Sequence, residues 1–172
     1  MNSGYILELP VKPHVRKYII SRFKKSENIS ITKTDFVGIL IYNFLEKPTK
    51  LLRLKPIEGP SISFRLSEHL LEHDGVTISE NKIHDFNLFI DKLLKEEMFL
   101  YVDAHLHTRI EINMLIRDFM DLHLLTEDDI KFDTLKKNYY RYRKRREAWN
   151  IPLLFRYAIK PEICSSPGLR KV

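Results

Sequence analysis

The chain has 172 residues, 44% of them hydrophobic and 30% charged, and a formal net charge of +6. This much apolar material excludes a disordered chain, and the length is sufficient to bury a hydrophobic core. Only 5 residues are glycine, which argues against a turn-rich all-β fold and against glycine-rich phosphate-binding loops.

The N-terminal part of the chain predicts two strands and two helices. Residues 5–9 alternate in polarity, as a short half-buried strand does, and apolar side chains at helical spacing follow Pro13. A second helix is expected after Thr32, because Asp35 stands three residues further on and completes a capping box. Residues 61–66 alternate again, which makes them a candidate to pair with the first strand.

Residues 77–105 predict one long core helix. Thr77 and Glu80 have the spacing of a capping box, and apolar side chains then recur every three or four positions as far as His105. Together with the strands, these helices predict a mainly α fold with a small β element, of the α+β class. The expected organisation, in one compact domain, is an α+β scaffold over residues 1–108, a C-terminal unit over 109–150 and a tail over 151–172.

The C-terminal unit is predicted to contain three helices. The first covers residues 110–123, and a short helix with its own capping pair follows over residues 126–132. The third helix is basic, and Asp133 or Thr134 is its expected N-cap. Two short consecutive helices, of which the second is basic and faces outward, are the arrangement of a helix-turn-helix unit, whose second helix enters the major groove of DNA.

The positive charge is concentrated in two stretches. Residues 131–172 contain 12 Lys and Arg against 3 acidic residues. Residues 11–25 contain six Lys and Arg and no acidic residue. This distribution fits either two contacts with a polyanion, or one such contact and one solvated helix.

A helical wheel divides the basic helix into two faces. With Leu135 as the reference, Tyr139, Tyr142 and Trp149 lie within about 40° of it, as does the stem of Arg146, and together they form a stripe that can pack on a core. The side chains that we assign to nucleic-acid binding occupy the rest of the helix: Lys136, Lys137, Asn138, Tyr140, Arg141, Arg143, Lys144 and Arg145. The early residues are best placed for base edges, namely Lys136, Lys137, Asn138 and Arg141, and the later cations for phosphates.

Two segments resemble proteins of a known kind. They are "ELPVKPHVRKYI" near the start and "LTEDDIKFDTLKKNYYRYRKRR" towards the end, and they are similar to uncharacterised helix-turn-helix proteins of bacterial phages and mobile elements. The resemblance implies DNA binding in a setting of transcription regulation, replication or phage development. It carries over no catalytic residue and leaves residues 48–108 unexplained.

Two histidine-containing patterns suggest metal sites but lack the context that such sites need. His69 and His73 fit the H-x-x-E-H pattern of zinc peptidases, yet their segment is short and offers no third ligand. His105 and His107 resemble a segment of metal-dependent amidohydrolases, whose barrel needs on the order of 250 residues. On a helix these two side chains would diverge by about 200°. We therefore expect no catalytic residue, no metal and no cofactor, and do not expect an enzyme.

Duplex DNA is the predicted partner, and two alternatives remain open. Single-stranded nucleic acid could stack on Tyr140, and an acidic protein surface could bind the basic helix of an adaptor or phage assembly component. A homodimer is a candidate state because helix-turn-helix proteins commonly bind paired half-sites. The sequence has a single cysteine, Cys164, and it has neither the layout of a signal peptide nor a long apolar run. These features predict a cytoplasmic protein without a membrane partner.

Overall fold

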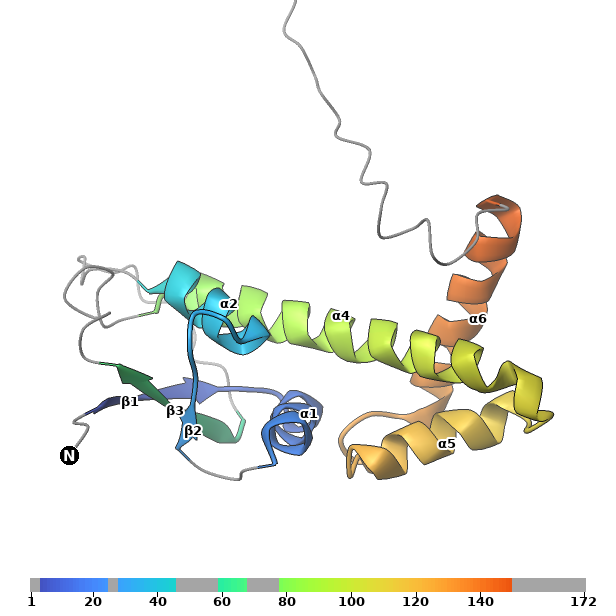
Figure 1. Ribbon diagram of the computed structural model, residues 1–172, viewed down its shortest axis with the longest axis horizontal. Helices are drawn as coiled ribbons and strands as arrows, with labels where there is room; N and C mark the ends of the chain where they lie inside the picture. The colour runs from blue at the N-terminus through green and yellow to red at the C-terminus, as the bar shows by residue number, and fades with distance from the viewer. Residues whose placement is uncertain (1–3, 25–27, 46–58, 68–77, 150–172) are drawn as a thin grey trace, which may run out of the picture. The chain divides into compact units, whose positions relative to one another are not determined.

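The computed structural model describes residues 4–24, 28–45, 59–67 and 78–149 (Figure 1). The chain divides into two compact units, Met1–Tyr139 and Tyr140–Val172, and each is described by itself. The elements in chain order are β1 (Gly4–Pro10), α1 (Pro13–Phe23), β2 (Ile29–Ser30), α2 (Phe36–Phe44), β3 (Ser61–Ser67), α4 (Glu80–His105), the 3₁₀ turn η1 (Leu106–Thr108), α5 (Ile112–Leu122) and α6 (Phe132–Trp149). The fold is mainly helical with a small mixed sheet, which confirms the predicted α+β class.

The sheet has the strand order β1-β3-β2. β1 and β3 pair antiparallel, from Gly4 opposite Ser67 to Pro10 opposite Ser61, and this confirms the predicted strands and their candidate pairing. The sequence did not predict β2, a two-residue strand that lies parallel to β3 with Ile29 opposite Phe64. So short a strand has too few residues to show an alternating pattern, and its pairing with β3 defines it.

α4 forms the centre of the first unit. Its buried side chains follow the predicted spacing of three or four residues, at Phe86, Ile90, Leu94, Met98 and Val102. The helix contacts α1, α2 and α5, and α5 folds back along its C-terminal half (Figure 1). The predicted end of the helix is confirmed by the structure. The predicted capping box cannot be compared, because its threonine at position 77 lies outside the described residues.

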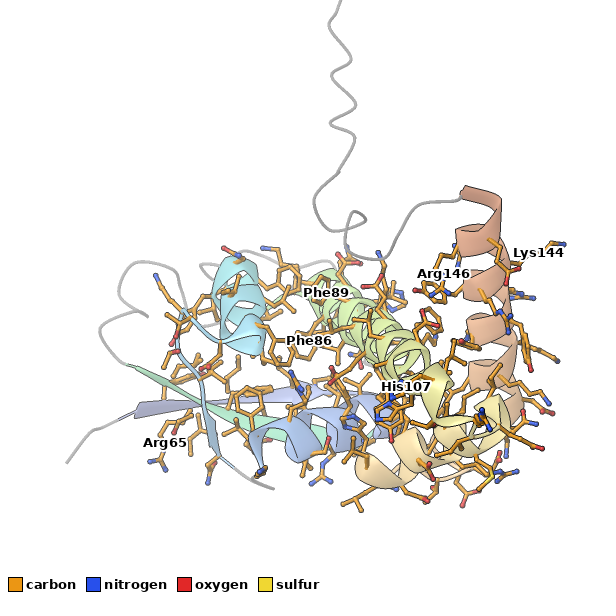
Figure 2. The ribbon with its side chains drawn as sticks, turned by 45° about the vertical axis from the view of Figure 1, so that its right-hand side comes forward. Arg65, Phe86, Phe89, His107, Lys144 and Arg146 are labelled. Carbon is orange, nitrogen blue, oxygen red and sulfur yellow. The ribbon has the colours of Figure 1, made fainter. Side chains whose placement is uncertain are left out.

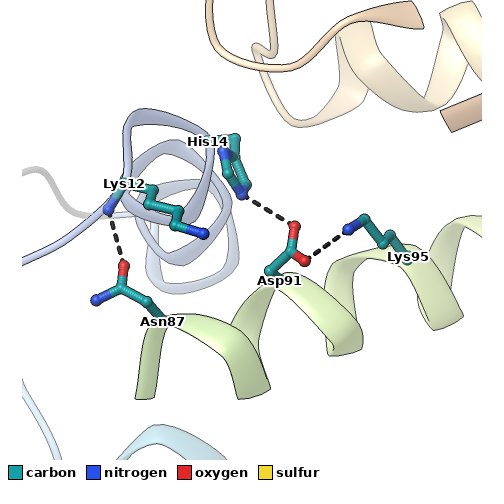
Figure 3. A network of polar contacts seen from close by, with 5 residues as sticks. All are labelled: Lys12, His14, Asn87, Asp91 and Lys95. Carbon is teal, nitrogen blue, oxygen red and sulfur yellow. Dashed lines mark hydrogen bonds and ion pairs between the residues drawn. The ribbon is translucent and has the colours of Figure 1, made fainter. Parts of the chain in front are cut away.

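A network of polar contacts fastens α1 to α4 (Figure 3). The fully buried Asn87 accepts a hydrogen bond from the backbone N–H of Lys12 at 2.8 Å. One turn further along α4, Asp91 contacts His14 Nε2 at 3.0 Å and Lys95 Nζ at 2.6 Å. Burial alone would raise the pKa of Asp91, but the hydrogen bonds from these two side chains hold it down at about 2. The carboxylate is therefore charged throughout the physiological pH range.

Two of the predicted capping boxes close turns instead. Thr32 donates to Asp35 Oδ2 from its N–H at 2.8 Å and from its hydroxyl at 2.9 Å, and α2 begins only at Phe36. Thr126 donates to Asp129 Oδ2 in the same way, at 2.8 and 2.6 Å. In each pair the carboxylate thus binds the N–H and the hydroxyl of the threonine three residues before it, and in neither pair is the threonine the N-cap of a helix. The helix predicted over residues 126–132 is therefore wrong, and that segment is a turn.

The start of α6 also differs from the prediction. The helix begins at Phe132, so Asp133 and Thr134 lie within its first turn and neither is the N-cap. Glu127, from the preceding turn, accepts the N–H of Phe132 at 3.1 Å and so satisfies a group that an N-cap would otherwise bind. Within the described residues 109–149, α5 and α6 are joined by a turn, and the predicted three-helix unit of the helix-turn-helix type is not formed.

The C-terminus of α5 has a Schellman-type cap. The N–H of Leu125 donates to the carbonyl of Met120 at 2.8 Å, and Leu124 between them has a φ of 54°. This left-handed position usually holds glycine, because a side chain there crowds the backbone. The side chain of Leu124 is 69% exposed, so little packing offsets this strain.

Candidate nucleic-acid interface

α6 carries a concentration of positive charge. Its 18 residues, FDTLKKNYYRYRKRREAW, include seven Lys and Arg and two acidic residues, Asp133 and Glu147. The cations are distributed around the helix, since Lys144 and Arg146 project from different sides of it (Figure 2). At 1.5 Å per residue the helix is about 27 Å long, which lets it present cations to several phosphates.

The first part of α6 is attached to the first unit by its apolar side chains. Leu135 and Tyr139 are completely buried, as the helical wheel predicted. The phenol of Tyr139 donates to Asp103 Oδ1 at 2.9 Å, and its ring centre lies 6.2 Å from that of Phe99. Arg117 lies over the ring of Phe132, 4.4 Å from its centre. This end of the helix is therefore held by both packing and hydrogen bonding.

The structure places all eight predicted binding residues on α6. Five of them are exposed: Lys137, Tyr140, Arg141, Lys144 and Arg145. Three are half-buried: Lys136, Asn138 and Arg143. Lys136, Lys137 and Asn138 belong to the first unit, and the other five residues belong to the second. The side chain of Trp149 and the tail over residues 151–172 lie outside what the structure describes.

Two contacts within α6 involve its cations. Arg143 pairs with Glu147 at 2.8 Å, four residues further along, and the two side chains are 42% and 60% exposed respectively. Exposed pairs of this spacing contribute about 0.3 to 0.5 kcal/mol, so a phosphate can compete with the glutamate. Arg145 donates through Nε to the carbonyl of Arg141 at 3.3 Å, and this uncharged oxygen does not cancel the charge of the guanidinium.

The second basic stretch, on α1, has a different role. Lys17 pairs with Asp129 at 2.6 Å and Arg22 pairs with Glu97 at 2.9 Å. Arg16 donates to the carbonyl of Ser61 at 3.1 Å. These cations hold α1 against segments far away in the sequence, which no local pattern could reveal. Of the two basic stretches, α6 is therefore the stronger candidate for contact with a polyanion.

The histidines of the metal-site patterns do not converge in the described part of the chain. His105 donates through Nδ1 to the carbonyl of Tyr101 at 2.7 Å, and His107 lies exposed in η1. His69 and His73 lie outside the described residues. Among the residues that the structure describes, no three His, Cys, Asp or Glu side chains are grouped so as to hold a metal ion.

Comparisons with known proteins add no assignment. No protein-family model, curated protein or solved structure matches this chain. Across the described ranges, no helix combines the length and the apolar character that crossing a membrane requires. The chemistry of α6 is therefore the basis of any functional proposal.

Proposed function

We propose that this chain binds nucleic acid and that α6 contacts duplex DNA mainly through its phosphates. The observation that carries the proposal is the charge of α6, with seven cations against two acidic residues. The contrast with α1 supports it, because several cations there are engaged inside the fold. Phosphate contacts of this kind supply most of the affinity of non-specific DNA binding.

Sequence preference is expected to be weak. A helix-turn-helix protein uses its first helix to set the recognition helix in the groove, and the described residues form no such pair of short helices. Asn138 is half-buried, whereas Arg141 is exposed and has a guanidinium that can bind guanine through two hydrogen bonds. We therefore propose semi-specific binding in which Arg141 makes the principal base contact.

Single-stranded nucleic acid is a second candidate partner, favoured by one side chain. Tyr140 is 44% exposed and is followed directly by Arg141. An exposed aromatic ring among cations is a platform on which unpaired bases stack, and each such contact is worth about 1 to 3 kcal/mol. Substituting Tyr140 by Ala would then weaken binding to single strands more than binding to duplex.

Salt dependence tests the duplex proposal. With about five phosphate contacts, the logarithm of the affinity should fall against the logarithm of salt concentration with a slope of about −4 to −5. Replacing Lys144 and Arg145 together by Ala should flatten this slope by up to about two, for all duplex sequences alike. Fluorescence anisotropy titrations of labelled random duplexes at several salt concentrations would measure both quantities.

The matched control removes two exposed cations outside α6. Arg65→Ala combined with Lys92→Ala changes the net charge by the same amount, and both residues are exposed in the first unit. This variant should keep the wild-type slope. If it weakens binding as much as the α6 variant does, the interface is not on α6. A folded protein that binds no duplex at low salt would favour an acidic protein surface as the partner.

A further inference from the structure

His123 occupies a buried position where α1, α4 and α5 meet. It follows the last residue of α5 and is only 4% exposed. Its ring centre lies 5.1 Å from that of Tyr18 on α1 and 4.5 Å from that of Phe119 on α5. His123 Nδ1 lies 2.7 Å from the hydroxyl of Ser21, also on α1. The imidazole therefore joins the end of α5 to α1.

The hydrogen bonds around Ser21 determine which ring nitrogen carries the proton. The hydroxyl of Ser21 donates its only hydrogen to the carbonyl of Tyr18 at 2.8 Å, so it can only accept from His123. Nδ1 is then the protonated nitrogen of a neutral imidazole. Nε2 is buried and has no hydrogen-bond partner among the residues that the structure describes. The fold tolerates Nε2 at this position while it is an unprotonated acceptor. Protonation would give the ring a positive charge and give Nε2 a hydrogen to donate, with no acceptor to receive it.

We propose that His123 is a pH-sensitive contact, which holds the turn after α5 against α1 only while its imidazole is neutral. Acidification would place an unpaired cation between Tyr18 and Phe119, and the protein would relieve this by opening the contact between the turn and α1. The turn concerned covers residues 123–131 and leads into α6. This contact does not depend on what α6 binds.

The charged groups around His123 do not compensate for its burial. α4 contributes Glu97, whose charge would favour a protonated imidazole, and α1 contributes Arg22, whose charge opposes it. Glu97 is already engaged, because it pairs with Arg22 at 2.9 Å and accepts the hydroxyl of Tyr18. Burial is the largest influence, and it lowers the pKa of His123 below its ordinary value. α5 contributes the uncharged ring of Phe119.

A separate contact between α1 and the turn is ionic and should not titrate in the same range. Lys17 pairs with Asp129 at 2.6 Å. Burial of Asp129 acts to raise its pKa, but hydrogen bonds from Lys17 and Thr126 outweigh burial and lower it. This carboxylate therefore stays charged under the mildly acidic conditions in which an ordinary histidine is protonated. His123 is thus the group of this contact that responds first.

Amide hydrogen exchange measured residue by residue tests the proposal. The pKa of His123 is lowered in the folded state, so its stabilising effect is complete above about pH 6.5 and declines as pH falls below that value. The opening equilibrium constant of the turn should rise by up to about tenfold per pH unit in that range. The N–H groups of Leu125 and Ile130, both hydrogen-bonded in the turn, should lose protection, after correction for intrinsic exchange rates. Amides of the β1–β3 pair should not.

Two variants separate this effect from general acid sensitivity. His123→Asn keeps a donor where Nδ1–H lies and has no titrating group, so protection of the turn should become independent of pH. His84→Asn, at an exposed position on α4, should behave as the wild type. An unchanged pH dependence in His123→Asn would overturn the proposal.

A titration of the wild-type protein gives a test that requires no variant. The imidazole resonances of His123 in NMR spectra should shift with a midpoint below about 6.5, the value of an unperturbed histidine. A midpoint at or above that value would show that the fold does not disfavour the protonated ring, and would refute the proposal.

Discussion

Replacing Tyr139 by Ala should destabilise the protein severely, whereas the same change at the adjacent Tyr140 should not. Tyr139 is completely buried, and its truncation would leave a cavity between α6 and α4. Removing a buried aromatic ring in this way costs about 3 to 5 kcal/mol. The change also deprives Asp103 of the phenolic donor that lies 2.9 Å away. Tyr140 is 44% exposed, and substitutions at such positions usually change stability by less than about 0.5 kcal/mol.

Urea denaturation followed by circular dichroism measures both free energies of unfolding. A further variant, Tyr139→Phe, separates the effect of the hydrogen bond from that of the ring, because it keeps the ring and removes only the hydrogen bond to Asp103. It should cost about 1 kcal/mol, since the half-buried carboxylate can recover part of the bond from water. If Tyr140→Ala proved more destabilising than Tyr139→Ala, the helix would be rotated about its axis, and the assignment of its exposed residues would fail with it.

Two further predictions concern the polar network on α4 and the cap of α5. Asp91 has a folded-state pKa of about 2, below its ordinary value near 3.9, so its stabilising effect is present above that ordinary value and is lost as pH falls towards 2. Asp91→Asn should therefore cost about 2 kcal/mol at neutral pH and flatten the acid limb of a plot of stability against pH. Leu124→Gly should stabilise the fold by about 0.5 to 1 kcal/mol in thermal or urea unfolding. The free energy gained by removing the strain of the left-handed backbone should exceed the free energy lost because glycine gives the unfolded chain more entropy. Leu122→Gly, at a helical position nearby, should be destabilising, and equal effects of the two changes would contradict this reasoning.

The sequence predicted those parts of the fold in which one face of an element is buried. Apolar periodicity located α4, and alternation located β1 and β3, because burial on one face imposes the period of the element on its side chains. The same reasoning placed Leu135 and Tyr139 inward and Tyr140 outward on α6. The candidate binding residues therefore followed from periodicity and charge alone.

Local motifs failed where distant residues decide the outcome. Thr126 and Asp129 have the spacing of a capping box, but Asp129 also binds Lys17, which lies 112 residues away, and the segment closes as a turn. The cations of α1 appeared to be available for a polyanion because their partners, Glu97 and Asp129, are remote in the sequence. Tertiary partners of this kind leave no trace in a local window.

The buried amide of Asn87 fixes the rotation of α4 about its own axis. It accepts the N–H of Lys12 and donates to the carbonyls of Pro10 and Ile83, at 3.2 and 2.9 Å respectively. Apolar contacts have no direction, so they alone would tolerate small rotations and shifts of a long helix. A displacement of α4 by one residue would turn the amide away by about 100° and leave the backbone groups of Pro10 and Lys12 unsatisfied. One polar side chain thus aligns the central helix with the junction between β1 and α1.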